Sequence, residues 1–421
     1  MSETFYYLII SLLMLNFLFE NGLSLLNYFY PKKDLPDFLT KFYNKEKYEK
    51  SLAYEQAKLR FGLFMSVIQF AVVFLFFYFG GFGFADQLVT SLSNNYLLQN
   101  LLFFGLIAFV SDILSLPASI YYTFVLEEKF GFNKTSVKTF VFDKLKSWLL
   151  IVLLGGGILS LVVFIYELSG SDFWWITWLS ISLISLLFTA FYSEIIVPLF
   201  NKQSPLEAGE LRNAIEEFSK KAGFKLTNIF TIDGSKRSTK ANAYFSGIGS
   251  KKRIVLYDTL INDLEVDEIV AVLAHEIGHY KKKHTLMGIG MSVIQTGIML
   301  FILSYFIAKD SQISTDLAQA VAGNNEKIKA SFYLGIIGFS LIYSPVSLIF
   351  GTLFNFISRK NEYSADAFAA AYGLSKYLGT ALIKLTVNNL SKVFPHPVYL
   401  FFHYSHPSLM QRLSKLGFSK N

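Results

Sequence analysis

The sequence contains no cysteine and few charged residues, and both shortages limit what the protein can be. Without cysteine among its 421 residues, the chain has no disulfide, no thiol nucleophile and no cysteine-based zinc site, so a metal site must use histidine and carboxylate ligands. Only 16% of the residues are charged, against about 25% in soluble domains. Because 53% are hydrophobic and the mean hydropathy is +0.42, the composition indicates an integral membrane protein.

Seven apolar segments are long enough to cross the roughly 30 Å of hydrocarbon in a bilayer. They lie at about residues 5–29, 61–83, 97–125, 148–166, 173–200, 285–308 and 332–357. We therefore expect an all-α polytopic membrane protein with five transmembrane helices in residues 1–200 and two in residues 285–357. A soluble segment at 201–284 separates these two groups, and a C-terminal segment at 358–421 follows them.

Lysine and arginine are distributed unevenly among the connections between these segments. Nearly all of the 38 lie in four of them, at 30–60, 126–147, 201–284 and 358–421. The others are Lys309, Lys327 and Lys329. The positive-inside rule then places the basic connections in the cytoplasm and the N-terminus outside. This bias accounts for the net charge of +7, so we expect the lipid bilayer as a partner and no nucleic acid.

The motif with the strongest chemical meaning is His275-Glu276-Ile277-Gly278-His279. Side chains four residues apart lie on one face of an α-helix, so the two histidines can bind a single Zn²⁺, with Glu276 beside them as a candidate general base. The alternative is a chance pair of histidines. Against it, the apolar residues form a stripe nearly opposite the histidines: Val266, Ile269, Val270, Leu273 and Ile277. We expect this helix to run from about Asp263 to Tyr280, capped by Asn262.

The soluble segment also carries signals of a small sheet. Residues 205–222 have the pattern of an amphipathic helix. Short β-like runs follow, at Asn228 to Asp233, Asn242 to Gly247 and Arg253 to Tyr257. Together with the histidine helix they predict a small α+β module, in which an edge strand can hold an extended peptide. For Asn242 and Ala243, substrate contact and plain structural sheet are equally supported by these residues.

A zinc protease needs a third protein ligand, and the topology indicates Glu362. After His279 the chain crosses the membrane outward and then back, so Glu362 returns to the side on which the histidines lie. Asp366 follows four residues later on the same helical face, where it can orient a ligand histidine. The alternative for Glu362 is an ion pair with Arg359 or Lys360.

Two residues of the C-terminal segment are further candidates. His406 can donate a hydrogen bond to the tetrahedral oxyanion of a peptide hydrolysis, and Arg412 can anchor the substrate or the nearby carboxylates. Taken alone, each is more often a surface or capping residue. His284, His396 and His403 carry no assigned role.

The chain resembles the type I CAAX prenyl endopeptidase family, the a-factor-converting integral-membrane zinc metalloproteases. The resemblance rests on motifs spread over most of the sequence: Phe130-Gly131-Phe132-Asn133-Lys134, Pro198-Leu199-Phe200-Asn201-Lys202, Ser235-Lys236-Arg237-Ser238, Asn242-Ala243-Tyr244-Phe245, Asp258-Thr259-Leu260, His275 to Tyr280, Asn361-Glu362-Tyr363-Ser364-Ala365-Asp366, and Ser405-His406-Pro407 with Arg412. The related bacterial heat-shock membrane protease family resembles a shorter chain with fewer crossings. The length of this chain and its seven expected crossings therefore favour the prenyl-endopeptidase branch.

This resemblance implies a barrel of seven helices around a large water-filled chamber, with one Zn²⁺ at its cytoplasmic end. It implies that His275, His279 and Glu362 are the ligands and that Glu276 is the catalytic base. It further implies that His406 and Arg412 act in the transition state. It also implies that Asn242 and Ala243 contact the substrate strand. In the family the substrate is a protein that ends in a prenylated Cys-a-a-X sequence and is cleaved after the cysteine.

We therefore expect a zinc endopeptidase that removes the C-terminal aaX tripeptide from prenylated proteins or peptides. Its membrane would be the endoplasmic reticulum in a eukaryote and the inner membrane in a bacterium, with the catalytic site facing the cytoplasm. One alternative is a quality-control zinc protease that acts on unprenylated membrane proteins. Another is an ion transporter or channel. Some support comes from Asp112 and Glu194, because the third crossing contains both Asp112 and Pro117 and is expected to be broken or to face a pore. The last is a non-catalytic membrane scaffold.

Overall fold

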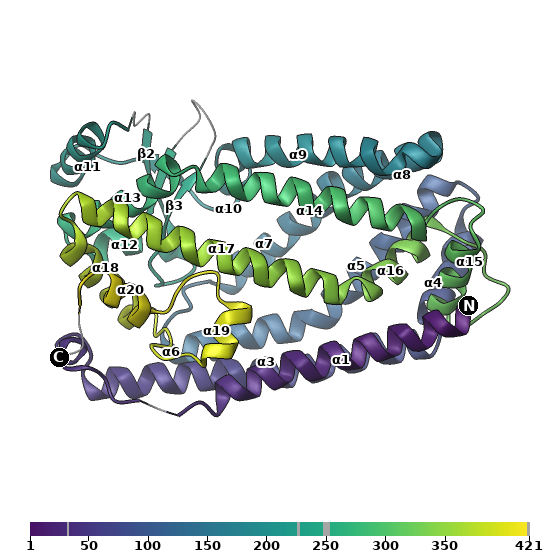
Figure 1. The fold of residues 1–421 in the computed structure, drawn as a ribbon, viewed down its shortest axis with the longest axis horizontal. Coiled ribbons are helices and arrows are strands. Elements are labelled where there is room, and N and C mark those ends of the chain that lie inside the picture. Colours follow the sequence, from purple (N-terminus) through teal and green to yellow (C-terminus); the bar gives the residue numbers. More distant parts are fainter. Residues whose placement is uncertain (32, 225–227, 247–252, 419–421) are drawn as a thin grey trace.

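The protein is seen in a computed structural model that describes residues 1–31, 33–224, 228–246 and 253–418 (Figure 1). Its first helices are α1 (Ser2–Tyr28), α2 (Asp37–Thr40), α3 (Lys45–Tyr78), α4 (Gly81–Leu92), α5 (Tyr96–Tyr121), α6 (Glu128–Phe130), α7 (Val137–Leu150), α8 (Gly156–Ser169), α9 (Phe173–Ile195) and α10 (Val197–Phe200). The later ones are α11 (Glu210–Lys221), α12 (Asp258–Asp263), α13 (Val266–Lys281), α14 (His284–Phe306), α15 (Gln312–Val321), α16 (Phe332–Ile342), α17 (Ser344–Ala371), α18 (Ser375–Asn388), α19 (Pro397–His403) and α20 (Leu409–Lys415). Two π-helical turns, η1 (Tyr122–Glu127) and η2 (Ile151–Gly155), and two 3₁₀ turns, η3 (Gly170–Asp172) and η4 (Gly234–Lys236), complete the helical elements.

Long apolar helices make up most of the molecule, as the composition predicts. In the described part of the chain, five helical stretches are long and apolar enough to cross a membrane, and a sixth is α16 with α17, which are bent by 58° where Pro345 begins the second helix. One of the five, Val137–Phe200, is 64 residues long and is interrupted by η3, after which α9 packs back against α8. A count of seven crossings requires this stretch to be two spans, and it stays a prediction.

The long helices lie side by side, and the mixed module sits at one end of them (Figure 1). The N-terminus lies at the opposite end, beside α4 and α15, whereas α18 and α20 lie with the module. Because α14 leads away from the module and α17 returns to it, residues distant in sequence meet at this end. The described parts of 201–284 and 358–421 share one apolar core, which contains both Leu273 and Leu378.

The two acidic residues that supported a transport site have partners in the fold. Asp112 on α5 accepts hydrogen bonds from Lys144 Nζ (2.6 Å) and Trp148 Nε1 (2.9 Å), both on α7. Glu194 at the end of α9 is ion-paired with Arg253. The third crossing is also not broken, because α5 continues through Pro117 and passes directly into η1. Asp112 therefore joins α5 to α7, and Glu194 joins α9 to β4.

The sheet has four strands in the order β1-β2-β4-β3: β1 (Gln203–Pro205), β2 (Asn228–Ile232), β3 (Ala243–Ser246) and β4 (Arg253–Tyr257). The three β-like runs of the sequence form β2, β3 and β4, and β1 was missed. β4 is parallel to β2 and antiparallel to β3, while β1 is antiparallel to β2. Strand β3 is consequently an edge of the sheet in the described chain.

Helix α13 begins three residues later than the sequence suggested. Residues 258–263 form their own short helix α12, and Glu265 rather than Asn262 is the N-cap of α13. A capping box closes this end, because Glu265 accepts from the backbone of Glu268 while the Glu268 carboxylate accepts from the backbone N–H of Glu265. Four residues of the apolar stripe of α13 are buried, Val266 is partly buried against the same core, and the stripe anchors the histidine-bearing helix in the module.

Candidate metal centre

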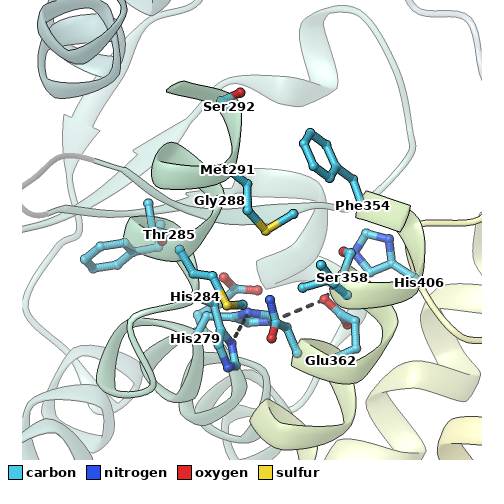
Figure 2. A pocket seen from close by; sticks show the side chains of 15 residues that line it. His279, His284, Thr285, Gly288, Met291, Ser292, Phe354, Ser358, Glu362 and His406 are labelled. Carbon is cyan, nitrogen blue, oxygen red and sulfur yellow. Dashed lines mark hydrogen bonds and ion pairs between the residues drawn. The ribbon is translucent and has the colours of Figure 1, made fainter. Parts of the chain in front are cut away.

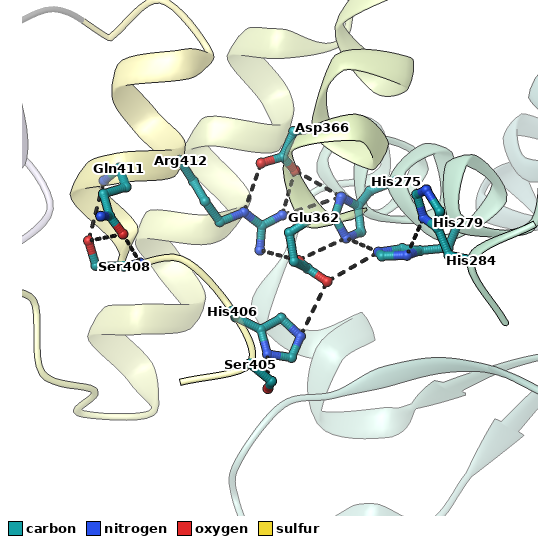
Figure 3. A network of polar contacts seen from close by, with 10 residues as sticks. All are labelled: His275, His279, His284, Glu362, Asp366, Ser405, His406, Ser408, Gln411 and Arg412. Atoms are coloured by element: carbon teal, nitrogen blue, oxygen red, sulfur yellow. Dashed lines mark hydrogen bonds and ion pairs between the residues drawn. The ribbon is translucent and has the colours of Figure 1, made fainter. Parts of the chain in front are cut away.

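Helix α13 and helix α17 bring two histidines and one carboxylate together (Figure 3). The close approach of the two helices depends on Gly278, because a Cβ at this position would lie 3.0 Å from Phe368 Cβ and 3.2 Å from Ala365 Cα. His275 lies one turn before His279 on α13, and Glu362 lies on the facing side of α17. The return of the chain through the membrane thus places Glu362 beside the histidines, as the topology argument predicted.

The donor atoms of these three residues face one another at short range. His275 Nε2 and His279 Nε2 are 3.1 Å apart, His279 Nε2 is 3.2 Å from Glu362 Oε1, and His275 Nε2 is 3.5 Å from Glu362 Oε2. Donor atoms that bind one tetrahedral zinc ion at about 2.0–2.1 Å lie roughly 3.3 Å apart. The group is the one set of at least three His or carboxylate ligands that the described residues bring within 4.8 Å of one another.

The carboxylate of Glu362 also fits a cation ligand. It is buried, and its Oε2 atom accepts no hydrogen bond from the described residues; it has only the longer ion-pair contacts to His275 Nε2 (3.5 Å) and Arg412 Nη1 (3.4 Å). A buried carboxylate oxygen without a hydrogen bond is costly, and a bound cation would satisfy it. Two neutral imidazoles and one carboxylate leave the fourth position of a tetrahedral ion open, as catalytic zinc sites require.

His275 is oriented at its Nδ1 atom by the ion pair of Asp366 and Arg412. Its Nδ1–H donates to Asp366 Oδ1 at 2.8 Å, and Arg412 binds the same carboxylate through Nε (2.9 Å) and Nη2 (2.6 Å). Burial alone lowers the pKa of His275, but the nearby Asp366 and Glu362 carboxylates stabilise its protonated ring and raise the pKa to about 9. Asp366 therefore lies where a carboxylate that orients a ligand histidine is expected.

His279 is held by a residue that the sequence analysis left without a role. Its Nδ1 atom lies 3.0 Å from Nδ1 of His284, the first residue of α14. The chain can turn back so sharply because Lys283, between the two helices, has a left-handed backbone with φ of 59°. If Nε2 binds a cation together with Glu362, the proton of the neutral His279 ring is on Nδ1, where it can be donated to Nδ1 of His284.

A cavity of about 440 Å³ opens beside this group (Figure 2). Its polar wall includes Glu276, His279, Glu362 and His406, and its apolar wall comes from α14 and α17. This cavity does not test the large chamber implied by the resemblance, which stays a prediction.

The predicted C-terminal residues approach the group from different sides. His406 Nε2 lies 3.4 Å from Glu362 Oε1, and its side chain is 63% exposed at the cavity (Figure 3). Arg412 is buried behind the histidines, with Nη1 3.4 Å from Glu362 Oε2, and does not line the cavity. Of the two functions expected for Arg412, the geometry matches the anchoring of the carboxylates. A direct part in the reaction stays a prediction for both residues.

Asn242 and Ala243 lie at the start of the edge strand β3. Asn242 is exposed, and its carbonyl accepts a hydrogen bond from Tyr257 N at 3.1 Å. Neither residue lines the cavity, but Phe245 of the same strand does, and Ala243 shares its face because residues two apart point the same way. Their contact with a substrate stays a prediction.

A multi-helix membrane fold that carries a His-Glu-x-x-His helix and a distant glutamate defines the class of integral-membrane metallopeptidases. Comparison with known proteins gives the family. The model described as CAAX prenyl protease N-terminal, five membrane helices, matches residues 26–202, and the model of peptidase family M48 matches residues 205–418. The chain belongs to the CAAX prenyl protease 1 family of M48 metalloendopeptidases.

Individual relatives agree over nearly the whole length. CAAX prenyl protease 1 from Saccharomyces cerevisiae is 37% identical over 401 residues, which cover 91% of this chain and 88% of the relative. The Homo sapiens homolog is 32% identical, again with 91% and 88% covered. The crystal structure of S. mikatae Ste24p matches with a TM-score of 0.90 at 36% identity, over 98% of both chains. The resemblance first seen in the motifs is thereby confirmed.

Proposed function

We propose that this protein is a zinc endopeptidase that removes the aaX tripeptide from proteins or peptides ending in a prenylated Cys-a-a-X sequence. The observation that carries the proposal is the convergence of His275, His279 and Glu362 beside a cavity that Glu276 also lines. The names of the relatives support the substrate class. A ligand set of two histidines and one glutamate supports zinc as the one bound ion.

In the proposed reaction each residue near the cavity has a separate task. A bound zinc ion supplies a Lewis acid that polarises the scissile carbonyl and acidifies water. Glu276 accepts the proton of the attacking water and delivers it to the leaving amine. His406, which reaches the cavity from the C-terminal segment, donates a hydrogen bond to the developing oxyanion. Arg412 and Asp366 keep the His275 ring in its orientation.

The surroundings of the cavity suit an extended peptide. Because β3 is the edge strand, its outer backbone groups can pair with a substrate strand that starts near Asn242 and Ala243. Phe245 then lies next to the peptide, and apolar side chains of α14 and α17, such as Met287 and Phe354, can receive its aliphatic residues. This arrangement supports cleavage close to an apolar C-terminus.

We further propose that the protein resides in the endoplasmic reticulum membrane with its catalytic end in the cytoplasm. The uneven distribution of lysine and arginine supports this orientation, because the basic connections 30–60, 126–147 and 358–421 belong to the end that carries the metal centre.

The test of the chemistry is the substitution Glu276→Gln. The amide has nearly the same size but cannot accept the proton, so turnover of a farnesylated peptide should fall by about 10²–10⁴-fold while the zinc content stays that of the parent. Product release is measured by mass spectrometry, with a chelator-treated parent as the zero-activity control. Cleavage by Glu276→Gln at the parental rate contradicts the proposed role of Glu276.

The substrate class has its own test. The farnesylated peptide is compared with its unmodified twin at equal concentration, and the proposal predicts a higher kcat/KM for the farnesylated one. Equal values favour instead the quality-control protease that acts on unprenylated chains. The metal chemistry is common to both, so this result leaves the role of Glu276 intact.

A further inference from the structure

A second large cavity lies away from the metal centre, against α3. It has a volume of about 700 Å³ and lies between α3 on one side and α5, η1 and α6 on the other. Phe61 on α3 stacks on Tyr121 with ring centroids 5.3 Å apart, and Tyr54 contacts Phe130 at 4.9 Å, so the two walls are in contact at these points. The rest of the cavity is an open groove, in which Phe64 on α3 and Leu114 on α5 are exposed.

The groove is apolar at one end and cationic at the other. Its apolar part is lined mainly by Phe64, Met65, Ile68, Leu114 and Pro117, of which all but Met65 are exposed. The charged residues that line it are Arg60 and Lys129, and both are positive. An exposed apolar groove with two cations at its mouth is complementary to an amphiphile with a negative head.

The carboxylates near the two cations are engaged elsewhere. Glu127 binds Lys240 Nζ at 2.6 Å and also accepts from the Tyr54 hydroxyl. Glu128 accepts from Asn133 Nδ2 at 3.0 Å, and Glu55 pairs with Lys58 at 2.9 Å. The positive charge at the mouth of the groove is therefore not cancelled by these acidic neighbours.

The length of the groove matches one leaflet of a bilayer. From Ala57 to Ile68, α3 rises by roughly 16 Å, which is about half of the 30 Å hydrocarbon thickness. Helix α6, which contains Lys129, lies beside α3, where Phe130 contacts Tyr54 in the first half of α3 (Figure 1). A lipid whose phosphate binds this pair would place an acyl chain along the apolar part and end it near the bilayer centre.

We propose that this groove is a binding site for one anionic phospholipid, with the head-group phosphate held by Arg60 and Lys129 and an acyl chain along Phe64 and Leu114. The site is separate from the metal centre and does not depend on the proposed reaction. In a prenylated Cys-a-a-X peptide three residues separate the prenyl chain from the C-terminal carboxylate, whereas in a phospholipid the acyl chains begin next to the phosphate. Because the apolar lining starts directly beside the two cations, at Phe61 and Phe130, it fits the phospholipid better than the prenylated substrate.

The test uses the detergent-purified full-length chain, delipidated and mixed with equal amounts of phosphatidylserine and phosphatidylcholine of the same acyl composition. Native mass spectrometry measures the lipid retained. The parent should prefer phosphatidylserine, and Arg60→Gln with Lys129→Gln should reduce its affinity for this lipid by about thirtyfold, the factor expected for two cations at a membrane surface. The matched control replaces two exposed lysines outside the groove, Lys138→Gln with Lys376→Gln, and should keep the preference.

A second variant tests the groove itself without a change of charge. Ala118→Trp fills the apolar part beside Pro117, and it should reduce retention of phosphatidylserine while the zinc content stays that of the parent. Three results overturn the proposal: no head-group preference in the parent, an equal loss in the control pair, or displacement of the lipid by a farnesylated peptide that lacks phosphate.

Discussion

The two histidines of the metal centre are held in unlike ways at their second ring nitrogens. His275 donates to the Asp366 carboxylate, which Arg412 in turn binds, whereas His279 faces the neutral ring of His284. A carboxylate raises the basicity of the imidazole that donates to it more than a neutral acceptor does. His279 is therefore the candidate ligand whose second ring nitrogen is supported only by a neutral partner.

We predict that His284→Phe weakens zinc binding by about 10–100-fold, the usual cost of removing such a supporting hydrogen bond. The phenyl ring keeps the bulk but offers no acceptor for His279 Nδ1–H. His284→Asn, which restores an acceptor, should recover part of the affinity. Competition with a chelator of known affinity measures the effect.

The control for this prediction is His403→Phe. His403 Nε2 lies 3.3 Å from Glu20 Oε2, away from the metal centre, so the same substitution there should leave zinc affinity unchanged. If His284→Phe binds zinc as tightly as this control, the supporting role of His284 is wrong.

Single residues of the candidate metal centre could be predicted from the sequence where their position follows from spacing on one helix or from the path of the chain. His275 and His279 are four apart on one helix, and Glu362 could be located because the chain must cross the membrane and return. His284 follows His279 by five residues, which on a continuous helix would place it on another side. Its contact arises because the helix ends at Lys281 and Lys283 turns the chain, and no periodicity in the sequence shows that turn.

The elements of the centre meet through the packing of α13 on α17. This contact requires Gly278, since a side chain there would collide with Ala365 and Phe368. Because Glu362 lies one turn before Ala365 on α17, any separation of the helices moves the carboxylate away from the histidines.

We expect Gly278→Ala to lower the free energy of unfolding by about 1–3 kcal/mol, as overpacking of a close contact does, and to weaken zinc binding. Thermal unfolding of the metal-free protein and chelator competition measure the two effects. Gly351→Ala on the same α17 is the control, because a Cβ there meets nothing within 4 Å. Equal stability and zinc affinity in the two variants would show that the close approach at Gly278 is not required.

Element boundaries were predicted less well than element types. The sequence offers Asn262 as a helix cap, but residues 258–263 form their own helix and Leu264 is extended, so the cap moves to Glu265. Strand β1 was missed because a three-residue strand that includes Pro205 has no alternating pattern, and it exists only because β2 pairs with it.

In the whole molecule, the module that contains α13 lies at one end and the N-terminus at the other (Figure 1), and nearly all lysine and arginine residues belong to the module and to three connections. Composition and charge bias were enough to predict a polytopic helical membrane protein. Lipid around the helices requires apolar residues, and the position of the basic residues follows the two sides of the membrane, so neither depends on contacts between helices. The number of crossings was harder to predict. Whether Val137–Phe200 turns back at Gly170 and whether α16 and α17 form one span depend on contacts between helices.

The orientation can be tested cleanly because the chain has no cysteine. We predict that a single cysteine introduced by Glu207→Cys, in the exposed part of the soluble segment, reacts with a membrane-impermeant maleimide in sealed microsomes. Lys327→Cys, at the opposite end, should react only after the membrane is permeabilised. The reverse pattern would place the metal centre in the lumen.

The most direct test of the whole account is the zinc content of purified protein, measured by mass spectrometry for the parent, Glu362→Ala and Glu326→Ala. The account predicts about one zinc ion per chain in the parent and in Glu326→Ala, whose exposed carboxylate lies outside the centre, and almost none in Glu362→Ala. A Glu362→Ala protein that still carries a full equivalent of zinc would contradict a metal centre shared between α13 and α17.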